Sequence, residues 1–165
     1  MKPIVLTGMS GCGKSTIGKF LSQRLAVEFI DIDEEIEKKE SKSVSEIFDL
    51  FGEKYFRDIE KNIIFEKSKN GIISLGGGAF EDSETREFLL KNSLVIYLET
   101  SPEIIFKRLK NTSNRPLLKN ISIKKIDLII KKREKNYKLA PIKILTDNKK
   151  IESVVEEIIK CAGLK

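Results

Sequence analysis

The sequence contains no histidine and only two cysteines, Cys12 and Cys161, among its 165 residues. Zinc sites are built from histidine and cysteine side chains at short spacings such as C-x-x-C. The chain has neither, so a zinc site is not expected. Two isolated cysteines also form no disulfide framework, and we therefore expect a reducing, cytoplasmic setting.

Long apolar runs are missing as well. No stretch approaches the roughly 20 apolar residues that cross a bilayer, and the apolar run near the amino terminus is too short for a signal peptide. The sequence also lacks repeats, low-complexity segments and linkers, which predicts one domain over residues 1–165. We expect a protein that has no membrane contact and acts as a monomer.

Acidic residues are fewer than basic ones, 25 against 31, which gives a net charge of +6. A basic balance is compatible with nucleic-acid binding. However, the lysines are scattered, and no basic tract interleaved with aromatic residues occurs. We favour a lysine-rich solvated surface with a site for anionic small molecules, and we expect no nucleic-acid partner.

Glycine is sparse, with ten residues in the chain, yet three of the ten are Gly8, Gly11 and Gly13. Residues 8–16 read G-x-x-x-x-G-K-S-T, preceded by an apolar run at 4–6 and followed by apolar residues at helical spacing. A strand, a glycine-rich turn and a helix in this order form a phosphate cradle of backbone N–H groups. A chance lysine in a glycine turn would not explain this context, so the sequence predicts binding of a nucleoside triphosphate.

The side chains of this loop have expected roles. Lys14 would reach the β- and γ-phosphates, and the Ser15 hydroxyl would be a Mg²⁺ ligand. Cys12 is either a small residue that fills the loop or a thiol open to modification. The expected nucleotide-binding residues of the loop are Gly11, Cys12, Gly13, Lys14, Ser15 and Thr16.

Short apolar runs alternate with helical patterns along the rest of the chain. The runs at 4–6, 27–33, 72–75, 94–98 and 142–146 predict five strands, and the amphipathic segments between them predict helices. Such alternation favours an α/β fold, a three-layer doubly wound parallel sheet with helices on both faces. We expect the strands to be buried on both faces.

Two predicted strands end in residues suited to a ligand. The strand at 27–33 ends in Asp31 and Asp33, and ligands bind outside the carboxyl ends of parallel strands. The strand at 72–75 runs into the glycines 76–78. This triplet indicates either a ligand lying against bare backbone or simply a flexible turn.

Missing motifs narrow the class of triphosphate-binding protein. No later strand ends in the acid and catalytic glutamate of motor ATPases, and no guanine-reading N-K-x-D occurs. A small-molecule kinase remains, which needs a metal, an acceptor hydroxyl and positive charge over the transferred phosphoryl group. Asp31 and Asp33 suit the metal and the acceptor hydroxyl. Arg57 and Arg133 suit an acceptor that carries a negative charge. Arg115 lies on an irregular segment, which could close over the phosphates as a lid.

Six motifs in order make the chain resemble the shikimate kinase family nearly end to end. They are the phosphate loop at 8–18, F-x-D-x-D at 29–33, F-R-x-x-E at 56–60, the glycine triplet at 76–78, R-P-L-L at 115–118 and R-x-x-x-Y at 133–137. The resemblance implies a P-loop kinase fold of the nucleoside-monophosphate-kinase type with strand order 2-3-1-4-5. It also implies substrate-binding helices at about 33–61 and a lid at about 111–121.

The same resemblance implies a reaction, the transfer of the γ-phosphate of ATP to the 3-hydroxyl of shikimate on the route to chorismate and the aromatic amino acids. By similarity, Asp33 binds that hydroxyl as the candidate general base, and Asp31 helps Ser15 to hold Mg²⁺. The implied catalytic residues are Asp33, Lys14 and Arg115. The implied substrate-binding residues are Asp33, Arg57, Gly77, Gly78 and Arg133. The implied ATP contacts outside the loop are Arg108, near the adenine, and Arg115.

Two other interpretations remain open from the residues. The first is a related kinase for another hydroxylated acceptor, such as gluconate or a nucleotide. The second is a nucleotide-gated binding or regulatory module, which only the net charge of +6 favours.

Overall fold

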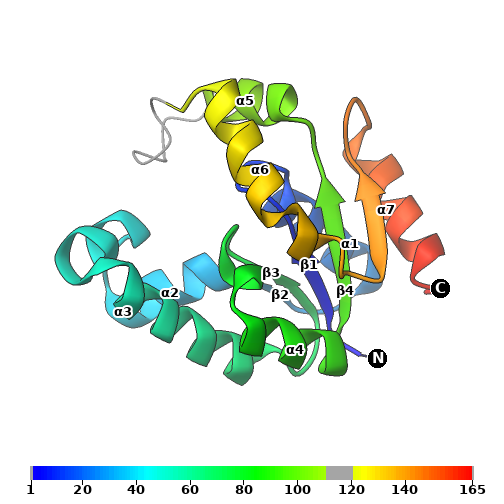
Figure 1. Ribbon diagram of the computed structural model, residues 1–165. Helices are drawn as coiled ribbons and strands as arrows, with labels where there is room; N and C mark the ends of the chain where they lie inside the picture. The colour runs from blue at the N-terminus through cyan, green and yellow to red at the C-terminus, as the bar shows by residue number, and fades with distance from the viewer. Residues whose placement is uncertain (1, 111–120, 165) are drawn as a thin grey trace.

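Five parallel strands form the sheet of the computed structural model, which describes residues 2–110 and 121–164 (Figure 1). The strands are β1 (Ile4–Thr7), β2 (Phe29–Asp31), β3 (Ile72–Ser74), β4 (Leu94–Glu99) and β5 (Ile142–Leu145). Their order is β2-β3-β1-β4-β5, and every neighbouring pair is parallel. The predicted strand order and the α/β class are confirmed.

Helices connect the strands. They are α1 (Lys14–Leu25), α2 (Ile32–Glu40), α3 (Val44–Lys67), α4 (Ser83–Asn92), α5 (Pro102–Lys110), α6 (Ile123–Tyr137) and α7 (Ile151–Cys161), with a short 3₁₀ turn η1 (Ala79–Glu81). In the described part of the chain, no helix is both long enough and apolar enough to cross a membrane.

Alternate residues of the strands face opposite helical layers, as the two-residue period of a strand requires. On β1, Ile4 and Leu6 pack with the apolar side chains of α1 and α7. Val5, between them, packs in a second cluster with side chains of α3 and α4. Helices therefore cover both faces of the sheet, as predicted.

The expected burial of every strand on both faces is wrong for β5. Its Ile144 is buried against the α1–α7 layer, whereas Lys143 and Leu145 are exposed. The order of the strands explains this difference, because β5 lies at the edge of the sheet and pairs only with β4.

The predicted strand at 27–33 is also too long. β2 ends at Asp31, and Asp33 lies in the first turn of α2. The reason is local, since the Asp31 carboxylate accepts hydrogen bonds from the backbone N–H of Asp33 at 3.1 Å and of Glu34 at 3.4 Å. Such an N-cap starts a helix. Asp31 therefore ends the strand β2, and Asp33 lies in the first turn of the helix that follows.

Helix α3 is interrupted at Gly52. Gly52 adopts φ 81° and ψ 171° within α3, a conformation that bends the helix and that glycine adopts without strain. Ser43 and Glu46 form a capping box at the start of the same helix. Figure 1 shows α2 and the first half of α3 as an arm beside the sheet, facing α6.

Candidate active site

The glycine-rich loop between β1 and α1 adopts the tight turn that its sequence predicts. Gly8, Gly11 and Gly13 all have positive φ values, of 142°, 85° and 102°, a region that side chains rarely tolerate. The Lys14 ammonium group is buried within this turn and donates to the carbonyl oxygens of Gly8 at 2.8 Å and Met9 at 3.1 Å. The loop thus holds a positive charge at the amino terminus of α1.

Cys12 and Arg108 meet behind the loop. The Arg108 guanidinium donates to the carbonyl oxygen of Cys12 at 3.0 Å and lies 3.4 Å from that of Gly11. The Cys12 side chain is fully buried, which favours its interpretation as a filler of the loop over that of an accessible thiol. Arg108 therefore links α5 to the phosphate loop.

A cavity of about 550 Å³ opens in front of the loop, and we call it the donor cavity. Its lining includes the loop residues Gly11, Gly13, Lys14, Ser15 and Thr16. It also includes Ser10, Asp31, Asp33, Ser74, Leu75, Gly77, Arg108 and Leu109. A smaller cavity of about 170 Å³ continues from it past Gly13, Thr16 and Arg108 toward Thr146 and Lys149.

Ser15 and Asp31 form an oxygen pair at the floor of the donor cavity. The Ser15 hydroxyl donates to Asp31 Oδ2 at 2.5 Å. Within residues 2–110 and 121–164, no cluster of three acidic, cysteine or histidine side chains could hold a metal alone. Mg²⁺ usually takes only one or two protein oxygens and completes its shell with phosphate and water, so this pair has the chemistry that Mg²⁺ requires.

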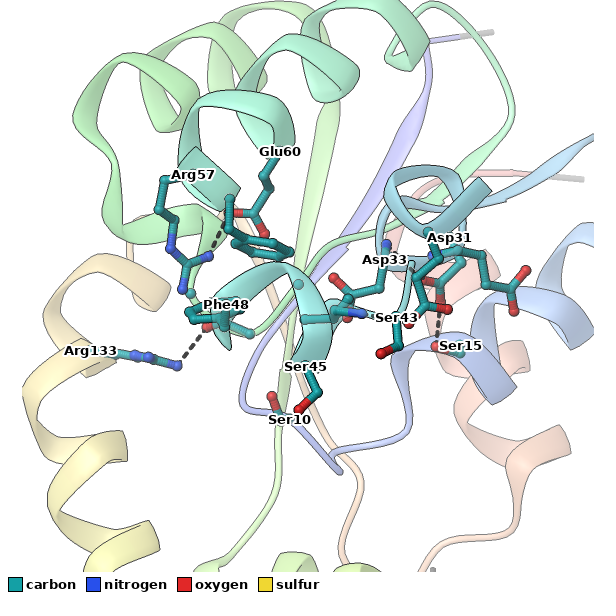
Figure 2. A pocket seen from close by; sticks show the side chains of 17 residues that line it. Ser10, Ser15, Asp31, Asp33, Ser43, Ser45, Phe48, Arg57, Glu60 and Arg133 are labelled. Atoms are coloured by element: carbon teal, nitrogen blue, oxygen red, sulfur yellow. Dashed lines mark hydrogen bonds and ion pairs between the residues drawn. The ribbon is translucent and has the colours of Figure 1, made fainter. Parts of the chain in front are cut away.

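A second cavity of about 530 Å³, the acceptor cavity, adjoins the first. The two cavities share the lining residues Ser10, Ser15, Asp31, Asp33 and Gly77. Figure 2 shows Asp31, Asp33 and Ser15 at one end of the acceptor cavity, with Arg57, Glu60 and Arg133 at the other. One end therefore carries the acids next to the phosphate loop, and the other carries two arginines.

Arg57 and Glu60 form a pair of unequal burial on α3. Arg57 Nη1 lies 2.5 Å from Glu60 Oε2, and the helical spacing of three residues brings them together. Burial raises the pKa of the Glu60 carboxyl to about 7, although the Arg57 guanidinium lowers it and Asp33 adds a smaller upward effect. The other oxygen, Glu60 Oε1, is buried and has no hydrogen-bond partner within the described residues.

The glycine triplet lies between these side chains, and it leaves no room for a Cβ atom. A Cβ on Gly76 would lie 2.5 Å from Glu60 Oε1, and one on Gly78 would lie 2.5 Å from Arg57 Nη2. From α6, Arg133 Nη1 donates to the carbonyl oxygen of Gly77 at 2.9 Å. The close approach of charged groups to bare backbone favours the ligand interpretation of the triplet over that of a flexible turn.

Comparison with known proteins agrees with this geometry. The family model for shikimate kinase matches residues 10–162. A shikimate kinase of Persephonella marina is 45% identical over 161 residues, which cover 96% of this chain and 98% of that protein. The chain belongs to the shikimate kinase family.

Solved structures of the family have the same fold. The shikimate kinase of Bacteroides thetaiotaomicron superposes with a TM-score of 0.90 at 33% identity, covering 99% of both chains. The shikimate kinase of Acinetobacter baumannii in complex with shikimate superposes with a TM-score of 0.91 at 32% identity, covering 98% of this chain and 93% of that chain. These likenesses extend over nearly all of the chain.

Most of the predicted site residues lie around the two adjoining cavities of this shikimate kinase family member. The exceptions are Cys12, which is buried behind the loop, and Arg115, which lies outside the described residues together with most of the expected lid. Sequence reasoning did not include Ser10, Phe48 or Phe56 among the substrate-binding residues, yet they also line the acceptor cavity. For Glu60, the three-residue spacing from Arg57 was a usable signal of pairing, but nothing local indicated its burial.

Proposed function

We propose that this chain transfers the γ-phosphoryl group of ATP to the 3-hydroxyl of shikimate, producing shikimate 3-phosphate for aromatic amino-acid biosynthesis. The observation that carries the proposal is that the donor and acceptor cavities adjoin, with Asp33 among the residues that line both. A hydroxyl held there would face the end of a triphosphate bound to the loop, which is the in-line arrangement that phosphoryl transfer requires.

On the donor side, the loop N–H groups and the amino terminus of α1 would bind the phosphates. Lys14 would exchange its contacts with the Gly8 and Met9 carbonyl groups for contacts with the β- and γ-phosphates. The smaller cavity past Arg108 leads away from Asp33 and would take the nucleoside end of ATP. Ser15 and Asp31 would hold Mg²⁺, which supplies positive charge on the phosphate oxygens and orients them.

On the acceptor side, two arginines suit a carboxylate because the planar guanidinium matches its two oxygens. Arg57 and Arg133 would bind the shikimate carboxylate at the end of the cavity remote from the loop. Asp33 would accept a hydrogen bond from the 3-hydroxyl and take its proton as the new oxygen–phosphorus bond forms and the bond to the β-phosphate breaks. Because the transition state is loose, positioning contributes more than proton removal.

The proposed function also bears on the oligomeric state, the cellular location and the number of domains. We propose that the chain works as a monomer in the cytoplasm and as one domain over residues 1–165.

The test is an assay of ADP release with MgATP and shikimate as acceptor. We expect ADP release that depends on shikimate and saturates with it, whereas gluconate and nucleoside monophosphates should give only background. Mass spectrometry should find one added phosphate on shikimate. Release with another acceptor but not with shikimate would assign the site to a related kinase, and no acceptor-dependent release would overturn the proposal.

A further inference from the structure

Tyr137 is buried at the end of α6, behind the glycine triplet. Its hydroxyl donates to the carbonyl oxygen of Gly77 at 2.6 Å. Its ring stacks on the ring of Tyr97 from β4, with centroids 5.0 Å apart and an angle of 21° between the planes. Burial raises the pKa of Tyr137 to about 12, so the phenol keeps its proton and remains a donor at neutral pH.

Two donors therefore converge on one carbonyl group. Arg133, one helical turn before Tyr137 on the same face of α6, donates to the same Gly77 oxygen at 2.9 Å. Two bonds from one rigid helix hold this carbonyl group in a fixed direction, toward α6. The pairing matters because Gly76, Gly77 and Gly78 lack side chains that would limit rotation of the backbone.

The direction of this carbonyl group also sets the direction of an N–H group. The peptide bond between Gly77 and Gly78 is trans, and in a planar trans peptide the C=O and N–H groups point in opposite directions. The N–H of Gly78 thus points away from α6. Among the described residues, neither this N–H nor that of Gly77 has an acceptor, and both glycines line the acceptor cavity.

We propose that Tyr137 is a positioning residue for the acceptor, which holds the Gly77–Gly78 peptide so that its N–H group is presented to the bound substrate. The proposal rests on the proposed function, because the substrate is the shikimate of that reaction. Tyr137 lines neither cavity, so it acts only through the backbone of Gly77.

Arg133 has two partners to serve once the acceptor is bound. In the proposed function its guanidinium group also binds the carboxylate of the acceptor, so its donors are divided between the substrate and Gly77. The Tyr137 hydroxyl has no such second task. It keeps the peptide oriented while Arg133 adjusts to the substrate.

The test compares two phenylalanine variants that each remove one buried hydroxyl from the same stacked pair. Tyr137→Phe loses the bond to Gly77, whereas Tyr97→Phe loses a hydroxyl that makes no hydrogen bond to the glycine triplet within the described residues. We expect Tyr137→Phe to raise the KM for shikimate about three- to tenfold, the effect of one ordinary hydrogen bond. The KM for ATP and the kcat at saturation should stay within twofold in both variants.

The controls separate positioning from mere stability. Replacing Tyr137 by 4-aminophenylalanine, which restores an N–H donor, should bring the KM for shikimate back toward that of the unaltered protein. A KM for shikimate that is unchanged in Tyr137→Phe, or that rises equally in Tyr97→Phe, would overturn the positioning role. An unaltered protein without shikimate-dependent ADP release would instead overturn the proposed function, and this proposal with it.

A spectroscopic measurement tests the same idea without turnover. Labelling glycine with ¹⁵N gives amide signals from only ten residues. In the unaltered protein, shikimate should shift the signals of Gly77 and Gly78. In Tyr137→Phe, the signals of Gly77 and Gly78 should have different chemical shifts even without ligand, and their shift on titration should need more shikimate to reach saturation. The signal of Gly163, near the carboxyl terminus, should be unchanged. Unmoved signals for Gly77 and Gly78 in the variant would contradict the proposal.

Discussion

The two halves of the site are built in different ways. The donor half comes mainly from one continuous stretch, residues 8–16, in which positive φ values at three glycines shape the backbone. The acceptor half combines Asp33 from α2, Arg57 from α3, Gly77 from the loop after β3 and Arg133 from α6. In the proposed function, backbone groups close in sequence would bind the phosphate chain, and charged side chains brought together by folding would bind the acceptor.

This difference predicts how the halves respond to mutation. Backbone N–H groups survive most side-chain changes, whereas truncating one charged side chain removes a whole contact from the acceptor half. Changes in the donor half should alter the dependence on ATP, and changes in the acceptor half should alter the dependence on shikimate. The residue where the cavities meet should affect turnover itself.

The largest effect is expected at that junction. Asp33→Asn keeps the shape of the side chain but removes the charge that, in the proposed function, accepts the hydroxyl proton, and kcat should fall by roughly 10²–10⁴, the usual range for general acid–base catalysis. The affinity for ATP, measured by calorimetry, should change by no more than a few-fold. Asp49→Asn, at an exposed position on α3, is the control and should leave kcat unchanged. A kcat for Asp33→Asn within a few-fold of the unaltered protein would remove the base role.

The second effect concerns stability as a function of pH. The pKa of Glu60 is about 7 in the folded protein, against an ordinary value of 4.5. At pH values between these two pKa values, Glu60 is protonated in the folded state but ionised in the unfolded state. The contribution of Glu60 to the free energy of unfolding is therefore fully present below pH 4.5 and is lost as the pH rises through about 7. The loss amounts to about 3 kcal/mol.

Chemical denaturation of the unaltered protein and of Glu60→Gln at pH values from 5 to 8 measures this loss. The free energy of unfolding of the unaltered protein should fall relative to that of the variant as the pH rises. The difference between the two proteins cancels the titration of other carboxyl groups, such as that of Glu35, whose pKa is lowered by Lys38 and Lys67. Parallel pH profiles would show that Glu60 does not titrate in this range.

The acceptor half should respond selectively to the loss of an arginine. Arg57→Ala would remove the charge-assisted hydrogen bonds that we propose to the acceptor carboxylate, and the KM for shikimate should rise about 10- to 100-fold while the KM for ATP stays the same. Arg24→Ala is the matched control, because Arg24 pairs with Glu156 on the exposed surface. A shikimate dependence that is unchanged in Arg57→Ala would withdraw the carboxylate assignment.

The smallest effect is expected in the donor half, and it should have the opposite selectivity. Arg108→Ala removes the contact with the Cys12 carbonyl group, and the KM for ATP should rise about three- to tenfold, as expected for one or two hydrogen bonds. The KM for shikimate should not change. Lys107→Ala, at the neighbouring exposed position on α5, should leave both values unchanged. If Arg108→Ala altered the two KM values equally, the division into halves would be wrong.

Much of the donor half could be predicted from the sequence because its causes are local. The positive φ values of Gly8, Gly11 and Gly13, and the start of α1 directly after them, follow from glycine chemistry and from apolar spacing within a few residues. The F-R-x-x-E motif also has a local effect, because the spacing of three residues puts Arg57 and Glu60 on one face of α3.

One error in prediction had a local cause, and the other arose from the arrangement of the strands in the sheet. Asp33 was placed at the end of a strand, but the Asp31 cap starts α2 before it. β5 was expected to be buried on both faces, yet its exposure depends on its place at the edge of the sheet. The residues 142–145 do not indicate that β5 pairs only with β4. They also do not indicate that one face of β5 lacks a covering helix.

The sequence by itself determined that the chain has a phosphate loop, an alternation of strands and helices and a set of motifs like those of shikimate kinases. Spacing within one turn or one strand encodes these features. Only the tertiary structure decided that Asp33 lines both adjoining cavities, that burial raises the pKa of Glu60, and that Tyr137 reaches the Gly77 carbonyl group. Dehydration of a carboxyl group and contact between residues 60 positions apart depend on how the helices pack on the sheet, and no local pattern records that packing.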